Sequence, residues 1–239
     1  MIPTLLYATL AGMADILGGL LVVTPARRSH RFQHFLVSFG AGFMLAVAVL
    51  EMLPDSMQAA GGLTAVLVGY LLVHLTQHTL TPHFHFGEET HEEAMVSRGI
   101  GGWALVGLLP HSFFDGVAIS SAFLAGPELG TLVFAAVALH KVPTGVSLAS
   151  VMLASGNSAR RAVLAVVAIA AATMLGAIVT PTVGVLVRYG LALSTGVTFY
   201  VAASNLIPEA QREPGWWVPA GVFLGVVAFY LVRLLLPAT

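Results

Sequence analysis

Long apolar runs separated by short polar segments occupy most of this 239-residue sequence. A helix needs about 20 predominantly apolar residues to cross the hydrocarbon core of a bilayer, and it satisfies its own backbone hydrogen bonds there. We therefore predict an all-α polytopic membrane protein with eight transmembrane helices. Their expected boundaries are 3–24, 33–56, 62–79, 99–124, 129–154, 162–186, 190–209 and 216–237.

The composition supports the same class. Hydrophobic residues make up 57% of the chain and charged residues only 9%, whereas soluble domains carry about 25% charged residues. The absence of cysteine excludes disulfides and thiolate metal sites, and the net charge of −1 argues against a nucleic-acid partner. The first apolar run lacks a basic leader, so we interpret it as a retained span rather than a cleaved signal. We expect residues 1–239 to form one transmembrane domain.

The arginines predict the orientation, because cytoplasmic loops of membrane proteins are enriched in basic residues. Seven arginines fall on one side of the predicted membrane: Arg27, Arg28, Arg31, Arg98, Arg160, Arg161 and Arg212. Only Arg188 and Arg233 fall on the other side. We therefore expect an inner-membrane protein with both termini extracytoplasmic. The loop of residues 80–98, which carries histidines and glutamates, is expected to be cytoplasmic.

Two similar segments suggest an internal repeat. "LEMLPDS" (Leu50–Ser56) ends the second predicted span, and "SNLIPEA" (Ser204–Ala210) ends the seventh. In the predicted orientation these two ends lie at opposite faces of the membrane. Similar sequence at opposite faces is typical of the inverted repeats of secondary transporters. We predict an inverted repeat in which two groups of three helices flank a central pair (3+2+3).

The fourth and fifth predicted spans carry a second pair of similar segments, "HSFFDGVAISS" and "HKVPTGVSLAS". His111 and Asp115 are four residues apart, so they project from one helix face, and His140 and Thr144 repeat that spacing. Pro110 directly precedes the first segment and Pro143 lies within the second, and a proline frees a backbone carbonyl. Ionisable residues at membrane depth cost a few kcal/mol each and usually face the bundle interior. We therefore expect these side chains to have a function.

A divalent transition metal fits these residue types. Imidazole nitrogen and carboxylate oxygen suit Zn²⁺ or Fe²⁺, and His111, Asp115 and His140 would supply three ligands. Water, Met44 or Thr144 would complete the coordination shell. The structural alternative is that the two histidines only hydrogen-bond across helices and hold the bundle together.

Further polar residues are candidates for the route of the ion. Histidine-rich tracts are typical of metal capture, and the third span and its loop carry His74, His78, His83, His85 and His91. A solvated loop with incidental histidines is the alternative. We place Glu51 and Asp55 at the outer mouth and Asn205 and Glu209 at the inner mouth; otherwise they are ordinary helix-end polar residues. Asp15, alone in the first span, has no assigned role.

These patterns resemble the Zrt/Irt-like (ZIP) family of divalent-metal transporters. "HSFFDG" is similar to the H-N-x-x-[DE]-G pattern of that family's fourth span, and "HKVPTG" is similar to the pattern of its fifth. The resemblance covers nearly the whole chain and implies eight spans, outward termini and a histidine-bearing third loop. It implies a metal site of Met44, His111, Asp115 and His140.

One departure from the family pattern changes the expected stoichiometry. Many members hold two metals side by side, and the resemblance maps the second site to Ser112, Asp115, Lys141, Thr144 and Thr180. Most acids of that set are missing, and a protonated lysine cannot ligate a metal. We predict a mononuclear centre in which Lys141 is a built-in counter-ion that pairs with Asp115. A neutral lysine ligand is the alternative.

The resemblance implies a transporter, not an enzyme, that moves Zn²⁺ or a similar ion such as Fe²⁺ towards the cytoplasm by alternating access. The metal is then a substrate, and no cofactor is expected. The other partner is the lipid bilayer, and a homodimer is compatible with the sequence. Two alternatives stay open: a zinc-dependent intramembrane hydrolase with Asp115 as base and Ser112 as stabiliser, and a non-transporting, regulatory ZIP relative.

Overall fold

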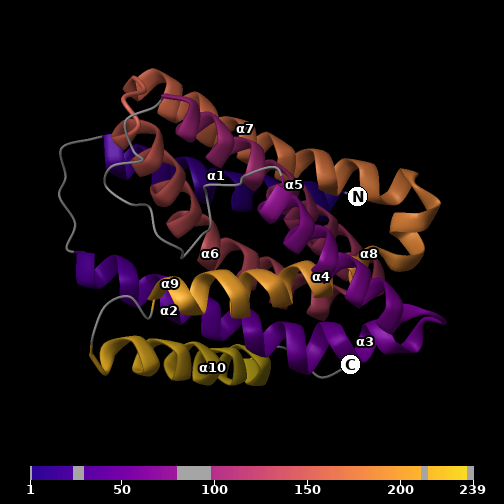
Figure 1. Cartoon of the computed structure of the whole chain (residues 1–239). Helices are drawn as coiled ribbons and strands as arrows, with labels where there is room; N and C mark the ends of the chain where they lie inside the picture. Colours follow the sequence, from indigo (N-terminus) through magenta and orange to yellow (C-terminus); the bar gives the residue numbers. More distant parts are fainter. Residues whose placement is uncertain (1, 24–29, 80–97, 211–214, 236–239) are drawn as a thin grey trace.

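The computed structural model describes residues 2–23, 30–79, 98–210 and 215–235, which are helical apart from short turns (Figure 1). No strand occurs among these residues, and the prediction of an all-α polytopic membrane protein is confirmed. The helices are α1 (Ile2–Val23), α2 (His30–Val47), η1 (Ala48–Met52), α3 (Leu53–Gln58), α4 (Gly62–Thr79), α5 (Arg98–Ala125), α6 (Pro127–Ala154), α7 (Ala159–Val179), η3 (Thr180–Thr182), α8 (Gly184–Phe199), η4 (Tyr200–Leu206), α9 (Ile207–Ala210) and α10 (Trp217–Leu235).

Each predicted span corresponds to a described helix or to consecutive helical segments, although the seventh begins at Gly184 rather than at the predicted residue 190. Seven helical segments in the described ranges are long and apolar enough to cross a membrane. The apolar part of α4, Gly62–Thr76, is shorter, but α4 packs closely along α8 and we count it as the eighth span. The sixth span ends earlier than the predicted residue 186. Pro181 lacks the N–H that would continue the helix, and Val183 is extended before α8 begins at Gly184.

The eight spans pack in two groups. α1, α5, α6 and α7 contact one another extensively, and the other group consists of two pairs, α2 with α10 and α4 with α8. Contacts of α5 with α8 and of α2 with α6 join the two groups. In Figure 1, α1 begins and α10 ends at the same end of the bundle. An even number of spans requires this arrangement.

Glycines set the closest helix crossings of the first group. A Cβ on Gly145 of α6 would overlap the backbone carbonyl of Asp15 in α1. A Cβ on Gly116 of α5 would likewise overlap the backbone carbonyl of Thr173 in α7. Small residues at membrane helix interfaces allow this close backbone approach. The α1–α6 crossing and the α5–α7 crossing are therefore built in the same way.

The second group shows the same pairing. Gly42 of α2 approaches the carbonyl of Val222 in α10, and Gly196 of α8 approaches the carbonyl of Val66 in α4. The four crossings are related in pairs. The α1–α6 crossing becomes the α5–α7 crossing, and the α2–α10 crossing becomes the α4–α8 crossing, when α1 is exchanged with α7, α2 with α8, α4 with α10 and α5 with α6. This exchange is the one that a 3+2+3 repeat would produce, and it agrees with the repeat predicted from the two Pro-acid segments.

The Pro-acid segments also share an unpredicted feature, a wide π-helical turn directly before each proline. In the first, the N–H of Leu53 bonds to the carbonyl of Ala48; in the second, the N–H of Ile207 bonds to that of Ala202. Both bonds span five residues, as in a π-helix. A proline at the next position cannot donate a hydrogen bond, which interrupts the regular ladder at that turn.

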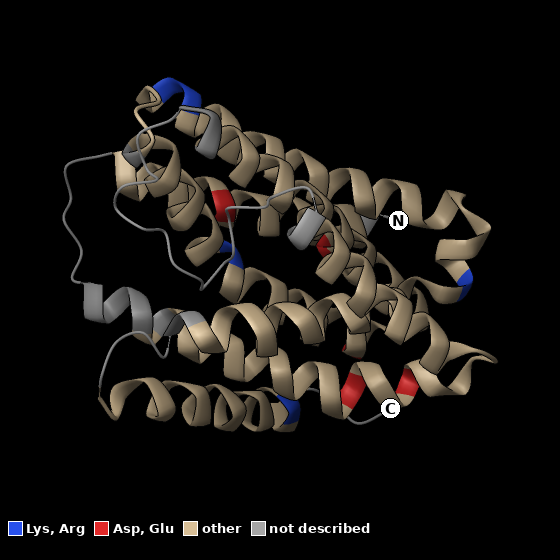
Figure 2. Cartoon of the chain, viewed as in Figure 1, with Lys and Arg blue, Asp and Glu red and all other residues tan. Residues whose placement is uncertain are grey.

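Large apolar side chains face outward, as expected in lipid. Along α1 the exposed large residues recur every three or four positions: Leu6, Leu10, Met13, Leu17 and Leu20. Ala8, Ala11 and Asp15 are buried on the opposite face. Figure 2 shows that charged segments are few, lying towards the ends of the bundle except for a small group inside it. Among the described residues, Asp15, Asp115 and Lys141 are buried.

Candidate metal centre

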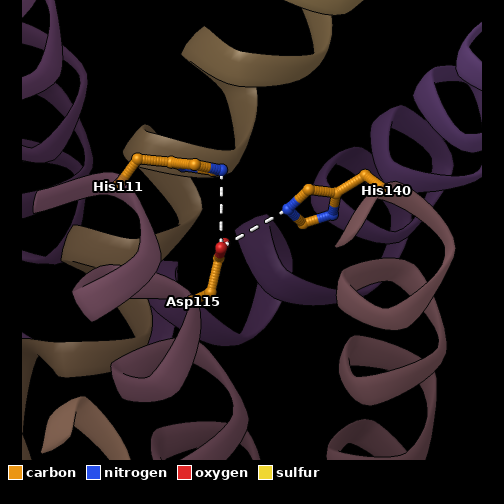
Figure 3. Close-up of side chains that lie close together, drawn as sticks. All are labelled: His111, Asp115 and His140. Atoms are coloured by element: carbon orange, nitrogen blue, oxygen red, sulfur yellow. Dashed lines mark ion pairs between the residues drawn. The ribbon is translucent and has the colours of Figure 1, made fainter. Parts of the chain in front are cut away.

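Three side chains from two neighbouring helices converge inside the bundle (Figure 3). Asp115 Oδ2 lies 3.4 Å from His111 Nε2 and 3.4 Å from His140 Nε2. One potential ligand atom from each residue lies within 4.8 Å of the other two, and all three residues are at most 4% exposed. The predicted convergence of two imidazoles and one carboxylate is therefore present in the structure.

Local geometry explains this convergence. His111 and Asp115 share a face of α5 because they are four residues apart. Gly126 alone separates α5 from α6, so the two helices turn back on each other and pack side by side. His111 and His140 lie at similar distances from that turn along their helices. Their ring centroids are therefore brought within 5.4 Å of each other.

The ring nitrogens are arranged as in a metal ligand set. His140 Nδ1 lies 3.0 Å from the carbonyl oxygen of Ala136, so Nδ1–H donates there and Nε2 keeps its lone pair. His140 Nε2 is buried and makes no hydrogen bond within the described part of the chain, and buried Asp115 Oδ2 has only ion-pair contacts, with the two histidines and Lys141. Buried polar atoms rarely lack a partner. A divalent cation would satisfy such donor atoms, and a backbone bond to the second nitrogen is typical of metal-ligating histidine.

A buried lysine lies beside this cluster. Lys141 Nζ is 3.0 Å from Asp115 Oδ2 and 3.0 Å from Asp15 Oδ2, and it donates a hydrogen bond to Ser112 Oγ at 3.1 Å. The contact between Lys141 and Asp115 is the one that we predicted. Asp15 is the residue that sequence reasoning missed. The available signal was that the chain's only lysine and the only acid of the first span each needed a buried partner.

Met44 lies on a helix that reaches the cluster. It is buried on α2, and Gly40, one turn earlier, faces α6. A Cβ on Gly40 would lie 3.8 Å from the Cα of His140. Residues four apart share a helix face, so Met44 lies on the side of α2 that crosses α6 near the candidate metal centre. Its role as a ligand stays a prediction.

Comparison with known proteins identifies the family. The family model described as "ZIP Zinc transporter" matches residues 73–235, more than half of the chain. The chain belongs to the ZIP family. A zinc transporter ZupT from Enterobacter sp. (strain 638) is 30% identical over 97% of this chain and 96% of its own length. Zinc transporters ZupT from Escherichia coli O7:K1 and Shigella flexneri serotype 5b are 29% identical, over 96% of both chains.

ZIP membership bears on two alternatives raised by the sequence. It identifies a transporter rather than an enzyme, so the intramembrane hydrolase is set aside. A regulatory ZIP relative stays an alternative hypothesis. Both the family match and the described helices support a multi-pass membrane protein.

The threonines assigned to the second ZIP metal site bond to their own helices. Thr144 Oγ1 donates to the carbonyl of His140 at 2.8 Å, and Thr180 Oγ1 donates to the carbonyl of Gly176 at 2.7 Å. Both residues are buried. Ser112, the third polar residue of this set, accepts the hydrogen bond from Lys141. Of this set, Ser112 and Asp115 contact Lys141, and the second metal site as a whole stays a prediction.

The residues expected at the outer mouth have partners in this ZIP chain. Arg233 Nε lies 2.9 Å from Glu51 Oε1, and Arg233 Nη1 lies 3.5 Å from Glu128 Oε2. The side-chain amide of Gln58 donates to Asp55 at 3.1 Å. Glu51 is thus paired with a cation of the chain itself. Recruitment of metal ions by these acids stays a prediction.

The remaining candidates lie partly outside the described residues. Asn205 is buried in η4 at the expected inner mouth, whereas the side chain of Glu209 is not described. His74 is exposed on α4, with its ring 5.8 Å from that of Tyr200. The side chain of His78 and the loop histidines His83, His85 and His91 also lie outside the described residues. Metal capture by this loop stays a prediction.

Proposed function

We propose that this ZIP protein transports Zn²⁺, or a similar divalent transition metal such as Fe²⁺, across the inner membrane towards the cytoplasm. The supporting observation is the buried convergence of His111, Asp115 and His140 on a common space between α5 and α6. The relatives with similar full-length sequences are named zinc transporters, which supports zinc as the substrate.

The spacing of the donor atoms supports a metal ion with tetrahedral coordination. Zinc binds histidine nitrogen and carboxylate oxygen at about 2.0–2.2 Å, so two ligands of a tetrahedral centre lie about 3.3–3.6 Å apart. The two carboxylate–imidazole distances are 3.4 Å. A metal held by His111, Asp115 and His140 would take Met44 or a water as fourth ligand. Three protein ligands and one exchangeable position would let the ion enter and leave.

The second-site position supports one metal per chain. Lys141 contributes a positive charge there and has three oxygen acceptors, from Asp15, Asp115 and Ser112. A protonated amine has no lone pair for a metal. We therefore expect one bound divalent ion, with the lysine in place of the second.

The two packing groups support alternating access. The candidate metal centre and Lys141 lie wholly in the group of α1, α5, α6 and α7, which contacts α2, α4, α8 and α10 less extensively than its own members. A shift of one group against the other around the site would expose the ion first to one side and then to the other. In the expected orientation both termini are extracytoplasmic, and the 80–98 loop receives the ion in the cytoplasm.

Uptake by proteoliposomes tests the transport proposal. We expect zinc uptake by the purified chain to fall at least about ten-fold in His111→Ala and Asp115→Ala, because each loses one of three ligands. Ser150→Ala, an exposed position on α6, is the matched control and should transport like wild type. If both ligand variants transport normally, the site assignment fails. If the wild type binds zinc but moves none, the chain is a regulatory relative.

Labelling tests the orientation. The natural chain has no cysteine, so single-cysteine variants need no background removal. Thr90→Cys in the 80–98 loop should react with a membrane-impermeant maleimide only after the cytoplasmic face is opened. Ala60→Cys, in the turn between α3 and α4, should react in intact cells. The reverse pattern would overturn the proposed direction of the termini.

A further inference from the structure

One carboxylate oxygen is shared by two different kinds of partner. Asp115 Oδ2 lies 3.4 Å from each of the two histidine Nε2 atoms and 3.0 Å from Lys141 Nζ. With the carboxylate oriented as it is here, a metal bound between the imidazoles would take this same oxygen as its anionic ligand. Metal and ammonium therefore compete for Asp115.

Lys141 has a second carboxylate that takes no part in the metal centre. Asp15 Oδ2 lies 3.0 Å from Nζ, and Asp15 is completely buried. Asp15 Oδ1 makes no hydrogen bond within the described residues. Lys141 is thus the cation that this acid faces, and Ser112 Oγ supplies a third, neutral acceptor at 3.1 Å.

We propose that Lys141 is an internal competitor of the metal ion and that Asp15 is the positioning residue that retains the lysine when the metal takes Asp115. This inference rests on the proposed function and concerns the same site. A buried ammonium that loses its only carboxylate is strongly unfavourable. With Asp15 in place, the lysine gives up Asp115 and still keeps one ion pair and one hydroxyl acceptor.

Backbone contacts between α1 and α6 hold Asp15, the second carboxylate partner of Lys141, in position. The carbonyl of Asp15 packs against Gly145 of α6, one turn beyond Lys141, and Gly18 of α1 packs against Val142. These two backbone contacts hold α1 and α6 close together next to the ion pair. The anchor is therefore present before and after the ion binds.

The charge balance makes the lysine selective. Two carboxylates and one ammonium give the group a net charge of −1, and a divalent ion brings it to +1. Only a cation that attracts Asp115 more strongly than the ammonium does can displace it, and Coulomb attraction scales with ionic charge. We expect the pair of Lys141 and Asp15 to exclude monovalent cations, and divalent cations that bind carboxylate weakly, from the candidate metal centre.

Zn²⁺ titration of the purified full-length chain in detergent, followed by calorimetry, tests the inference. The double variant Asp15→Asn/Lys141→Met keeps the net charge of −1 but lacks the competitor. It should bind Zn²⁺ about ten-fold or more tightly than wild type, because close charge pairs couple by at least about 1.5 kcal/mol. Asp15→Asn alone keeps the lysine but removes its second anchor, and should bind about ten-fold or more weakly.

The outcomes separate this inference from the proposed function. If wild type and His111→Ala bind Zn²⁺ equally well or not at all, the proposed metal centre itself fails. If His111→Ala weakens binding but the double variant matches wild type, Lys141 is only a structural counter-ion and the inference is overturned. Asp15→Asn binding as tightly as wild type would overturn it as well. Should the double variant not fold, that single variant decides alone.

Discussion

Replacing Gly145 by alanine tests how the α1–α6 crossing supports the site. A Cβ at this position would overlap the carbonyl oxygen of Asp15 and lie 3.0 Å from the backbone nitrogen of Gly19. Both neighbours are backbone atoms in the middle of a helix, so α1 itself must move. Any outward movement of α1 lengthens the 3.0 Å contact between Lys141 Nζ and Asp15 Oδ2.

Two effects of opposite sign set the change in the free energy of unfolding caused by Gly145→Ala. Alanine is more favourable than glycine inside a helix by about 0.5–1 kcal/mol. Overpacking of a close-packed interior costs about 1–3 kcal/mol, and backbone neighbours place Gly145→Ala in the upper part of that range. We therefore expect a net loss of about 1–2 kcal/mol in the free energy of unfolding. Zinc affinity should fall in parallel, because the second anchor of Lys141 is displaced.

Reversible unfolding in mixed detergent micelles measures the loss of unfolding free energy. Alanine substitutions at two further glycines serve as controls. Gly102→Ala in α5 has no atom within 4 Å of the added Cβ, so it should be neutral or stabilising by up to about 1 kcal/mol. Gly116→Ala, which would meet the carbonyl of Thr173 at the α5–α7 crossing, should lose about as much as Gly145→Ala. Equal stability of Gly145→Ala and Gly102→Ala would refute the reasoning.

Three further substitutions give expected outcomes in the same unfolding assay. Lys141→Ala leaves two buried carboxylates without their cation and should lower the free energy of unfolding by about 3–5 kcal/mol; a wild-type value would contradict the ion-pair geometry. Arg233→Gln removes ion pairs to two glutamates, but its side chain is 37% exposed, so we expect only about 0–1 kcal/mol, and a larger loss would mean that these pairs are not solvent-screened. Ser158→Ala removes the side-chain acceptor for the N–H of Arg161 at the start of α7 and should cost about 0.5–1 kcal/mol, with Ser158→Asn as the control that restores a cap.

The spans were predictable because the property that places a helix in a membrane is local. The run from Gly62 to Thr79 was predicted with the same limits that α4 has, since turn residues precede it and apolar residues fill it. The boundary near Thr180 was less accurate. There a proline within an apolar run ends one span and leaves only Val183 before the next, and apolarity alone does not mark the break.

The candidate site was predictable in part. The four-residue spacing of His111 and Asp115 places both on one helix face whatever the rest of the chain does. The similar segment around His140 supplied the partner helix. The pairing of Asp15 could not be read from spacing, because its partner Lys141 lies four spans further along the chain and no periodicity connects them.

The sequence by itself determined the all-helical class, the approximate course of the spans and the face that carries His111 and Asp115. These follow from bilayer thickness and helical periodicity, which act over one segment at a time. Only the tertiary structure decided that Lys141 faces two carboxylates and that Arg233 meets Glu51 and Glu128. Such contacts depend on how closely helices cross, and glycines such as Gly145 set that distance only when the partner backbone is in place.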